Sequence, residues 1–215
     1  MSTRASDGRV PGRRGQATRQ RLLECTRTML GSASYRDLKV VDLAREAGTS
    51  PATFYQYFTD VDAAIAELAG VMAAEGATRL NELLADTAWV GDDAHDSVRA
   101  LVAGFLEFWD ANRPLMSVID LKAAEGEGRL RAARKELLAT FSTELAKQAQ
   151  ANGGGDGSDR SDAGDPWAMA SVAVTMLVNV AIQREVFAAA DISDAALLDS
   201  VARLLLAAVT GSTDA

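Results

Sequence analysis

The stretch 43–58, with the sequence LAREAGTSPATFYQYF, constrains the fold more than any other part of this 215-residue chain. Apolar residues at helical spacing predict a short helix over 40–47. Gly48 suits the turn that follows, because glycine adopts a positive φ easily. Pro51 suits the first position of a second short helix, where its missing N–H has no intrahelical partner. The sequence therefore predicts two short helices joined by a tight turn.

Helical periodicity continues through the rest of the chain, and no strand-like alternation interrupts it. We expect further helices over 17–33, 60–86, 97–111, 115–125, 129–150, 167–190 and 193–210, with Asp60 as the cap of the long one. The fold class is all-α, with about nine helices: a three-helix N-terminal helix-turn-helix domain, then a larger helical bundle. Predicted boundaries are a flexible basic arm over 1–15, the helix-turn-helix domain over 16–61 and the bundle over 62–211, in which the Gly- and Asp-rich stretch 151–166 is a mobile loop.

Charge is distributed unevenly along the chain. The formal net charge is -8, which argues at first against a nucleic-acid partner. Residues 1–27, however, hold seven arginines against Asp7 and Glu24, a local net of +5, so the remainder carries -13. A basic arm beside an acidic body is the arrangement in which the arm meets phosphates.

Several classes of function find no support in the sequence. Cys25 is the only cysteine, so an intramolecular disulfide is impossible; we expect a small buried hydrophobe there and a reducing, cytoplasmic setting. His95, also single, is expected in a solvated loop or at a helix start, and not as a metal ligand. No apolar run is long enough to span a membrane, and no catalytic constellation or phosphate-binding glycine loop is present. We therefore expect no enzyme, no cofactor, no metal and no membrane partner.

The second short helix has the composition of a DNA reader. A helix enters the major groove when another helix holds it and when its outward residues are short or planar polar groups. Phe54 and Phe58, at i and i+4, can share one buried face. The residues left to contact bases or phosphates are Thr53, Tyr55, Gln56 and Tyr57, and at the helix entrance Thr49 and Ser50. The alternative is a plain helix-turn within a helical bundle.

From Thr18 to about Leu68 the sequence closely resembles the N-terminal domain of TetR-family transcriptional regulators. The matching elements are TRQRLL at 18–23, LAREAGTS at 43–50 and TFYQYF at 53–58. The resemblance implies a DNA-binding regulator with a ligand-sensing and dimerising C-terminal domain. It also implies a homodimer paired through its last two long helices and a palindromic double-stranded operator. We expect a repressor, with an activator as the other possibility, that is released when a small effector binds; the apolar residues of the bundle predict that this effector is largely hydrophobic. A helical adaptor or scaffold without DNA binding is the alternative.

Three positions depart from the family pattern. Lys39 stands where the family usually has a capping Ser or Thr; lysine cannot cap, but it can reach a phosphate. Pro51 replaces a basic or polar residue. The long helix opens with Asp60-Val61-Asp62, which places two carboxylates where the family commonly has a phosphate-contacting lysine. We expect these changes to weaken DNA binding and the basic residues Arg13, Arg14 and Arg19 to compensate.

One helix of the bundle carries a mixed stripe in which two amides lie among apolar residues: Val172, Met176, Asn179, Gln183 and Phe187. Unpaired burial costs about 1–3 kcal/mol for each amide, so Asn179 and Gln183 need partners in the core, at a dimer interface or in a ligand. If a ligand is the partner, an apolar pocket would combine Met176, Asn179, Gln183 and Phe187 with Met72, Phe105, Phe108, Trp109 and Met116. Ordinary core packing is the alternative for the aromatic residues.

Overall fold

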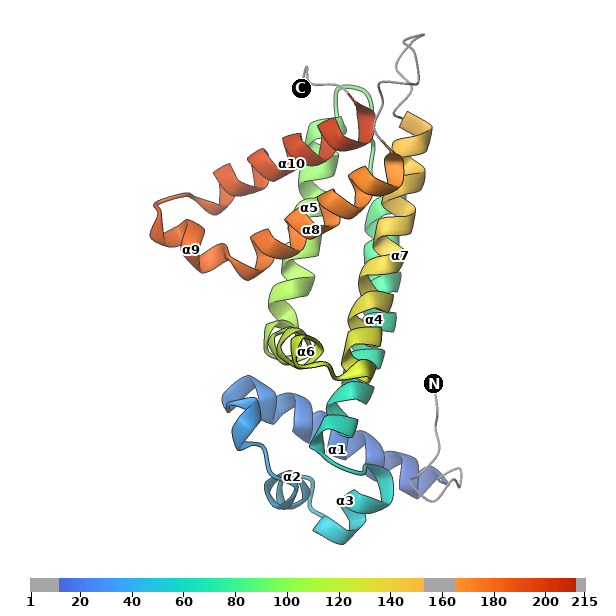
Figure 1. Cartoon of the computed structure of the whole chain (residues 1–215), viewed down its shortest axis with the longest axis vertical. Coiled ribbons are helices and arrows are strands. Elements are labelled where there is room, and N and C mark those ends of the chain that lie inside the picture. The colour runs from blue at the N-terminus through green and yellow to red at the C-terminus, as the bar shows by residue number, and fades with distance from the viewer. Residues whose placement is uncertain (1–11, 153–164, 212–215) are drawn as a thin grey trace. The chain divides into compact units, whose positions relative to one another are not determined.

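The computed structural model describes residues 12–152 and 165–211, and within them it is helical without strands. These described residues form ten α-helices: α1 (Arg13–Ser32), α2 (Val40–Glu46), α3 (Pro51–Tyr57), α4 (Val61–Ala85), α5 (Ala94–Ala111), α6 (Arg113–Glu125), α7 (Gly128–Asn152), α8 (Pro166–Ile182), α9 (Arg184–Ala189) and α10 (Asp194–Thr210). A 3-10 helix, η1 (Tyr35–Asp37), lies between α1 and α2 (Figure 1). The predicted all-α class is confirmed, whereas most of the loop predicted over 151–166 lies outside the described residues.

The described chain divides into two units, and α4 and α7 each pass from one to the other. The first unit ends its N-terminal part at Ala74 and adds Asn112–Lys135; the second combines Glu75–Ala111 with the chain from Glu136 onward. The first unit therefore holds α1, η1, α2, α3 and α6 with the first part of α4 and of α7. The predicted domain border at residue 61, by contrast, lies at the start of α4.

In the first unit, α1 buries one face made of Leu22, Leu23, Thr26 and Leu30. The Thr26 hydroxyl is satisfied in this face, because it donates to the Leu22 carbonyl at 2.8 Å. Helices α2 and α3 pack against each other and α2 packs against α1, so these three helices share one small core (Figure 1). Cys25 is only partly buried, which corrects the expectation of a buried hydrophobe.

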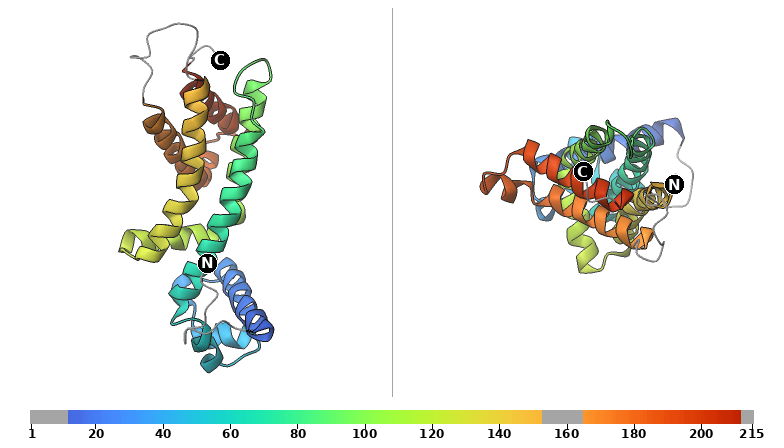
Figure 2. Two further views of the ribbon diagram at one scale, coloured as in Figure 1. Left: turned by 90° about the vertical axis from the view of Figure 1, so that its right-hand side faces the viewer. Right: turned by 90° about the horizontal axis from the view of Figure 1, so that it is seen from above.

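In the second unit, α5 packs against both α8 and α10, and α8 and α10 run side by side (Figure 2). The chain between α8 and α10 differs from the prediction, which had one helix over 167–190. The helix ends at Ile182, and α9 begins at Arg184. Arg184 explains how the break is held: its guanidinium pairs with Asp110 on α5 and, at 2.6 Å, with Asp194 on α10. One side chain thus fixes the α8–α9 junction to two other helices.

Two glycines mark places where helices of the second unit approach closely. A Cβ on Gly76 of α4 would lie 2.3 Å from Cζ of Phe108 and 2.8 Å from Cδ1 of Leu137. A Cβ on Gly104 of α5 would lie 2.6 Å from Cδ1 of Leu83. Because Phe108 and Leu137 are buried, neither can move aside without disturbing its own packing.

Replacing Gly76 by alanine is therefore expected to destabilise the protein by about 1–3 kcal/mol, the usual cost of overpacking a core. Thermal unfolding followed by circular dichroism measures the effect. Gly31→Ala is the matched control, since nothing lies within 4 Å of a Cβ built at that position of α1. Alanine there should leave stability unchanged or raise it by up to about 1 kcal/mol. Equal melting temperatures for the two variants would contradict the close approach at Gly76.

Candidate nucleic-acid interface

The turn between α2 and α3 has the geometry that the sequence predicts. Gly48 has a φ of 65°, in the left-handed region, and the Thr49 amide donates to the Ala44 carbonyl at 2.8 Å. Pro51 is the first residue of α3, and the Ser50 side chain accepts a hydrogen bond from the Thr53 amide at 3.2 Å. Ser50 is thus the N-cap of α3 as well as a residue of its exposed side.

The aromatic residues of α3 divide between the core and the surface. Phe54 is fully buried and Phe58 nearly so, with ring centroids 5.4 Å apart. Leu43 and Ala44 of α2 are fully buried in the same unit. A helix held on one side by two phenylalanine rings presents its opposite side in a fixed orientation, which base recognition requires.

The remaining predicted contact residues of α3 lie at the surface. Tyr55, Gln56 and Ser50 are exposed, and Thr49, Thr53 and Tyr57 are half-buried. The amide of glutamine pairs with adenine through two hydrogen bonds, and hydroxyl groups suit phosphate oxygens. The structure therefore brings all six residues to one short helix and its entrance.

Among the predicted basic contacts, Arg13, Arg14 and Lys39 are exposed, and Arg19 is not. Lys39 precedes α2 and makes no capping hydrogen bond, as expected. Arg13 begins α1, so the predicted arm over 1–15 ends inside a helix; residues 1–11 lie outside the described chain.

Arg19 has a partner within the protein. Its guanidinium pairs with Glu67 of α4 and lies 5.5 Å from the centroid of the Phe58 ring. Burial raises the pKa of Glu67, and the charge of Arg19 opposes that shift. The arginine therefore joins α1 to α4 and lies against Phe58 at the end of α3, and its phosphate contact stays a prediction.

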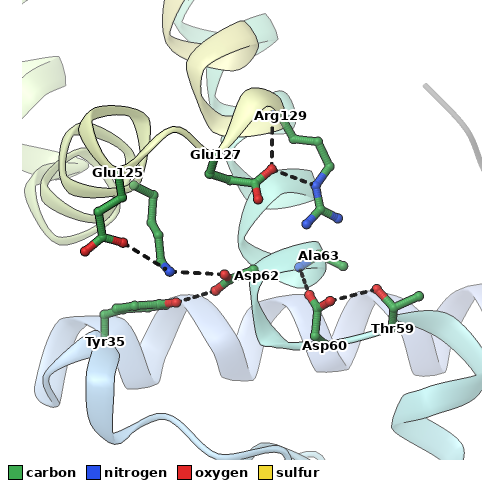
Figure 3. Close-up of polar contacts among 9 residues, drawn as sticks. Tyr35, Thr59, Asp60, Asp62, Ala63, Glu125, Glu127 and Arg129 are labelled. Atoms are coloured by element: carbon green, nitrogen blue, oxygen red, sulfur yellow. Dashed lines mark hydrogen bonds and ion pairs between the residues drawn. The ribbon is translucent and has the colours of Figure 1, made fainter.

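The two carboxylates at the start of α4 also have partners. Asp60 accepts a hydrogen bond from the Ala63 amide at 2.6 Å and so caps α4, as predicted (Figure 3). Asp62 accepts a hydrogen bond from the Tyr35 hydroxyl and lies 3.2 Å from Nζ of Lys122. One carboxylate thus caps a helix and the other is paired with a cation, and the expected weakening of DNA binding stays a prediction.

The residues predicted to line a ligand pocket fall into three groups. Met72 and Met116 are buried in the first unit, and Phe105, Phe108 and Trp109 are buried in the second. Phe105 contacts Phe141 of α7 with centroids 5.4 Å apart. Met176 and Phe187 are half-buried, whereas Asn179 and Gln183 are exposed. The two amides are not in the core, so that alternative is wrong for them.

The outer side of α8 is apolar and uncharged. The helix contains no charged residue over its 17 positions, yet Trp167, Met169 and Val172 are exposed. Ser171, Val172, Thr175, Met176 and Asn179 line a shallow depression on this side. A charge-free helix with one exposed apolar side is typical of a protein–protein interface.

His95 lies at a helix start, in the first turn of α5. Its Nε2 is 2.7 Å from Oδ1 of Asp199 on α10, and this hydrogen bond lowers the pKa of Asp199. Within residues 12–152 and 165–211, no cluster of histidine, cysteine, aspartate or glutamate could hold a metal ion. Over the same stretches, no helix is both long and apolar enough to cross a membrane.

A helix-turn-helix reader joined to a larger helical domain defines a DNA-binding regulator, and comparison with known proteins gives the family. Residues 22–68 match the family model of bacterial regulatory proteins of the tetR family, and residues 80–215 match that of the tetracyclin repressor-like C-terminal domain. The chain belongs to the TetR family. It is a DNA-binding transcriptional regulator with a C-terminal ligand-binding domain, and not an enzyme.

Solved structures share the fold at low identity. The fatty acid degradation regulator FadR from Bacillus halodurans has a TM-score of 0.64 at 16% identity, covering 92% of this chain and 97% of that one. A Rhodococcus protein of unknown function has a TM-score of 0.64 at 22% identity, covering 90% and 94%. FadR from Bacillus subtilis, solved in complex with stearoyl-CoA, has a TM-score of 0.58 at 16% identity, covering 90% and 98%.

Proposed function

We propose that the protein is a homodimeric repressor that binds a palindromic operator through α3 and leaves it when a hydrophobic effector binds the C-terminal domain. The observation that carries the proposal is the orientation of α3: Phe54 and the C-cap residue Phe58 are buried, whereas Tyr55 and Gln56 are exposed. A two-fold dimer presents two such helices, so its operator repeats one half-site in inverted order. Such a regulator acts where the DNA is, which supports a cytoplasmic location.

The dimer is proposed to form through α8 and α10. Helix α8 supplies an exposed side without charge, and α10 runs beside it with Ala196, Ser200 and Leu204 exposed at helical spacing. Small side chains let helices from two protomers approach closely, and Val172 and Leu204 supply apolar area to bury. Asn179 and Gln183 are exposed on the α8–α9 side; Asn179 already donates to the Thr175 carbonyl at 3.0 Å, and the remaining polar atoms of both amides can bond across this interface.

The proposed effector is a small molecule with a large apolar part. Support comes from the buried aromatic residues of α5 and from the fold shared with a FadR that was solved with stearoyl-CoA. Binding would act by population shift, favouring a conformation in which the two α3 helices no longer match successive major grooves. An effector that lowers operator affinity must itself bind more weakly to the operator complex, by the same factor.

Selection from a pool of random DNA duplexes tests the proposal without knowledge of the operator. The expected product is an inverted repeat that the wild-type protein binds. The Gln56→Ala variant should bind this duplex about 5–150-fold more weakly, because losing one base contact costs about 1–3 kcal/mol. Gln150→Ala, an exposed glutamine on α7, is the matched control. A protein that enriches no sequence would support the adaptor alternative instead.

Salt dependence tests the basic contacts. Replacing both Arg13 and Arg14 by glutamine is expected to flatten the slope of log affinity against log salt by about 0.9 for each phosphate that the variant no longer neutralises. The exposed Lys135 and Lys147 of α7 serve as the control pair for the same change of charge. An unchanged slope in the Arg13/Arg14 variant would remove the start of α1 from the interface.

A further inference from the structure

Lys122 is a lysine of α6 that contacts both flanks of the helix-turn-helix. Its Nζ lies 3.2 Å from Oδ2 of Asp62 and 4.9 Å from the centroid of the Tyr35 ring. The Tyr35 hydroxyl donates to the other oxygen of Asp62 (Figure 3). Lys122, Asp62 and Tyr35 therefore contact one another pairwise and form a closed set. Glu125, one turn further along α6, lies 3.4 Å from the same Nζ.

The side chains of this set are shielded from solvent, which strengthens the ion pair between Lys122 and Asp62. The Lys122 side chain is only 18% exposed and that of Asp62 27%, whereas an ion pair in full solvent contributes little. Hydrogen bonding to Tyr35 raises the pKa of Lys122, and burial raises the pKa of Tyr35. Both groups therefore keep their protons at neutral pH. A raised lysine pKa adds stability that is lost only as pH rises through that pKa, so the contribution of Lys122 is retained at neutral pH.

The three residues come from separate parts of the chain. Tyr35 begins η1, directly ahead of α2, and Asp62 lies in the first turn of α4, directly after α3. Lys122 belongs to the segment that matches the ligand-binding domain of the family. A single side chain of the sensing domain thus holds the entrance and the exit of the DNA reader.

The end of α6 that carries Lys122 is also fixed to α7. Arg134 of α7 pairs with Asp120 at 2.6 Å, and Arg131 donates to the Ala123 carbonyl at 3.2 Å. Gly126, with a φ of 100°, ends α6 immediately after these contacts. A displacement of α6 and the start of α7 would therefore move Lys122 with them and change its contacts with Tyr35 and Asp62.

We propose that Lys122 is the positioning residue through which the sensing domain sets the geometry of the DNA reader, by holding Asp62 and Tyr35 on either side of the helix-turn-helix. The proposal rests on the proposed function, since it concerns regulation of the same DNA-binding surface. Coupling between two sites is reciprocal. DNA bound at α3 must therefore alter α6 through Lys122, and this response can be measured without knowing the effector.

Hydrogen exchange of the wild-type dimer, with and without the duplex selected from the random pool, measures that response. Operator binding is expected to slow exchange about 5-fold or more both in α3 and in α6. Lys122→Met keeps the apolar stem of the side chain and removes its charge. In this variant, saturating DNA should still slow exchange in α3, whereas exchange in α6 should slow by less than about 2-fold. Lys122→Arg should restore it, and Lys135→Met, an exposed lysine of α7, should behave as wild type.

Operator affinities of single and double variants test the closed set itself. Lys122→Met and Asp62→Asn are each expected to weaken operator binding about 5-fold or more, because the flanks of the reader are no longer held. The fold-loss of operator affinity in the double variant should equal that of one single variant. It should not equal the product of the two single fold-losses. Arg134→Met, which breaks another ion pair of α6, controls for a general loosening of the helix.

The outcomes separate the two proposals. If the wild-type protein selects no duplex, the proposed function fails and the role of Lys122 fails with it. If it binds DNA and α6 of Lys122→Met responds as strongly as wild type, only the role of Lys122 is overturned. If Lys122→Met and Arg134→Met lose the α6 response equally, with equal falls in melting temperature, Lys122 merely stabilises the fold and the proposal is also overturned.

Discussion

Replacing Val172 by aspartate is expected to convert the protein into a monomer and to weaken operator binding by about 100-fold or more. Val172 is 68% exposed on the uncharged side of α8, so in a dimer the new carboxylate would be buried against apolar atoms. A monomer engages one half-site only and forgoes the gain that comes from linking two binding events. Light scattering should give a mass near 22.7 kDa in place of twice that value.

Val90→Asp is a closely matched control. Val90 is 67% exposed in the connection between α4 and α5, so it offers the same residue type and the same exposure outside α8 and α10. This variant should remain dimeric and bind the operator as wild type does. A dimeric Val172→Asp protein would contradict the proposed interface, whatever its DNA affinity.

Replacing Phe54 by alanine is expected to destabilise the reader by about 3–5 kcal/mol, the usual cost of deleting a fully buried phenylalanine ring. Phe54 is inaccessible to solvent, and its ring contacts those of Phe58 and Tyr55, with centroids 5.4 Å and 5.9 Å away. Because the ring fixes which side of α3 faces outward, its removal should abolish operator binding. Chemical denaturation and gel shifts on the selected duplex measure the two effects.

Tyr55→Ala, at the neighbouring position, separates folding from recognition. Tyr55 is 52% exposed, so removing its ring should change the unfolding free energy by less than about 1 kcal/mol while still weakening DNA binding. A stable Phe54→Ala protein with normal operator affinity would show that α3 is oriented by other contacts. Equal loss of stability in both variants would contradict the division of α3 into a core side and a DNA side.

The helix-turn-helix could be predicted from the sequence because short-range effects determine its turn and its helix ends. Gly48 adopts the positive φ expected of it, Pro51 begins α3, and Asp60 caps α4. Each of these effects depends on residues no more than four positions apart, so the sequence alone contains the necessary information. The buried pair Phe54 and Phe58 follows from the same helical periodicity.

Contacts between distant parts of the chain could not be predicted in this way. Arg19 and Glu67 are 48 positions apart, and Lys122 meets Asp62 across a still longer separation. Before folding brings them together, each looks like an ordinary charged residue on a helix surface. The ion pairs from Arg184 to Asp110 and Asp194, at the junction of α8 and α9, could not be predicted either, because they depend on how three helices pack.

The charge-free helix α8 has a consequence for how the regulator responds to its own abundance. If the exposed side of α8 is covered only by a second copy, protomers and dimers stay in equilibrium, and the dimer concentration rises with the square of the protomer concentration when protomers predominate. Halving expression in that regime would leave a quarter of the dimers. Occupancy of the operator would then change more steeply than protein synthesis, which gives a gene switch a threshold.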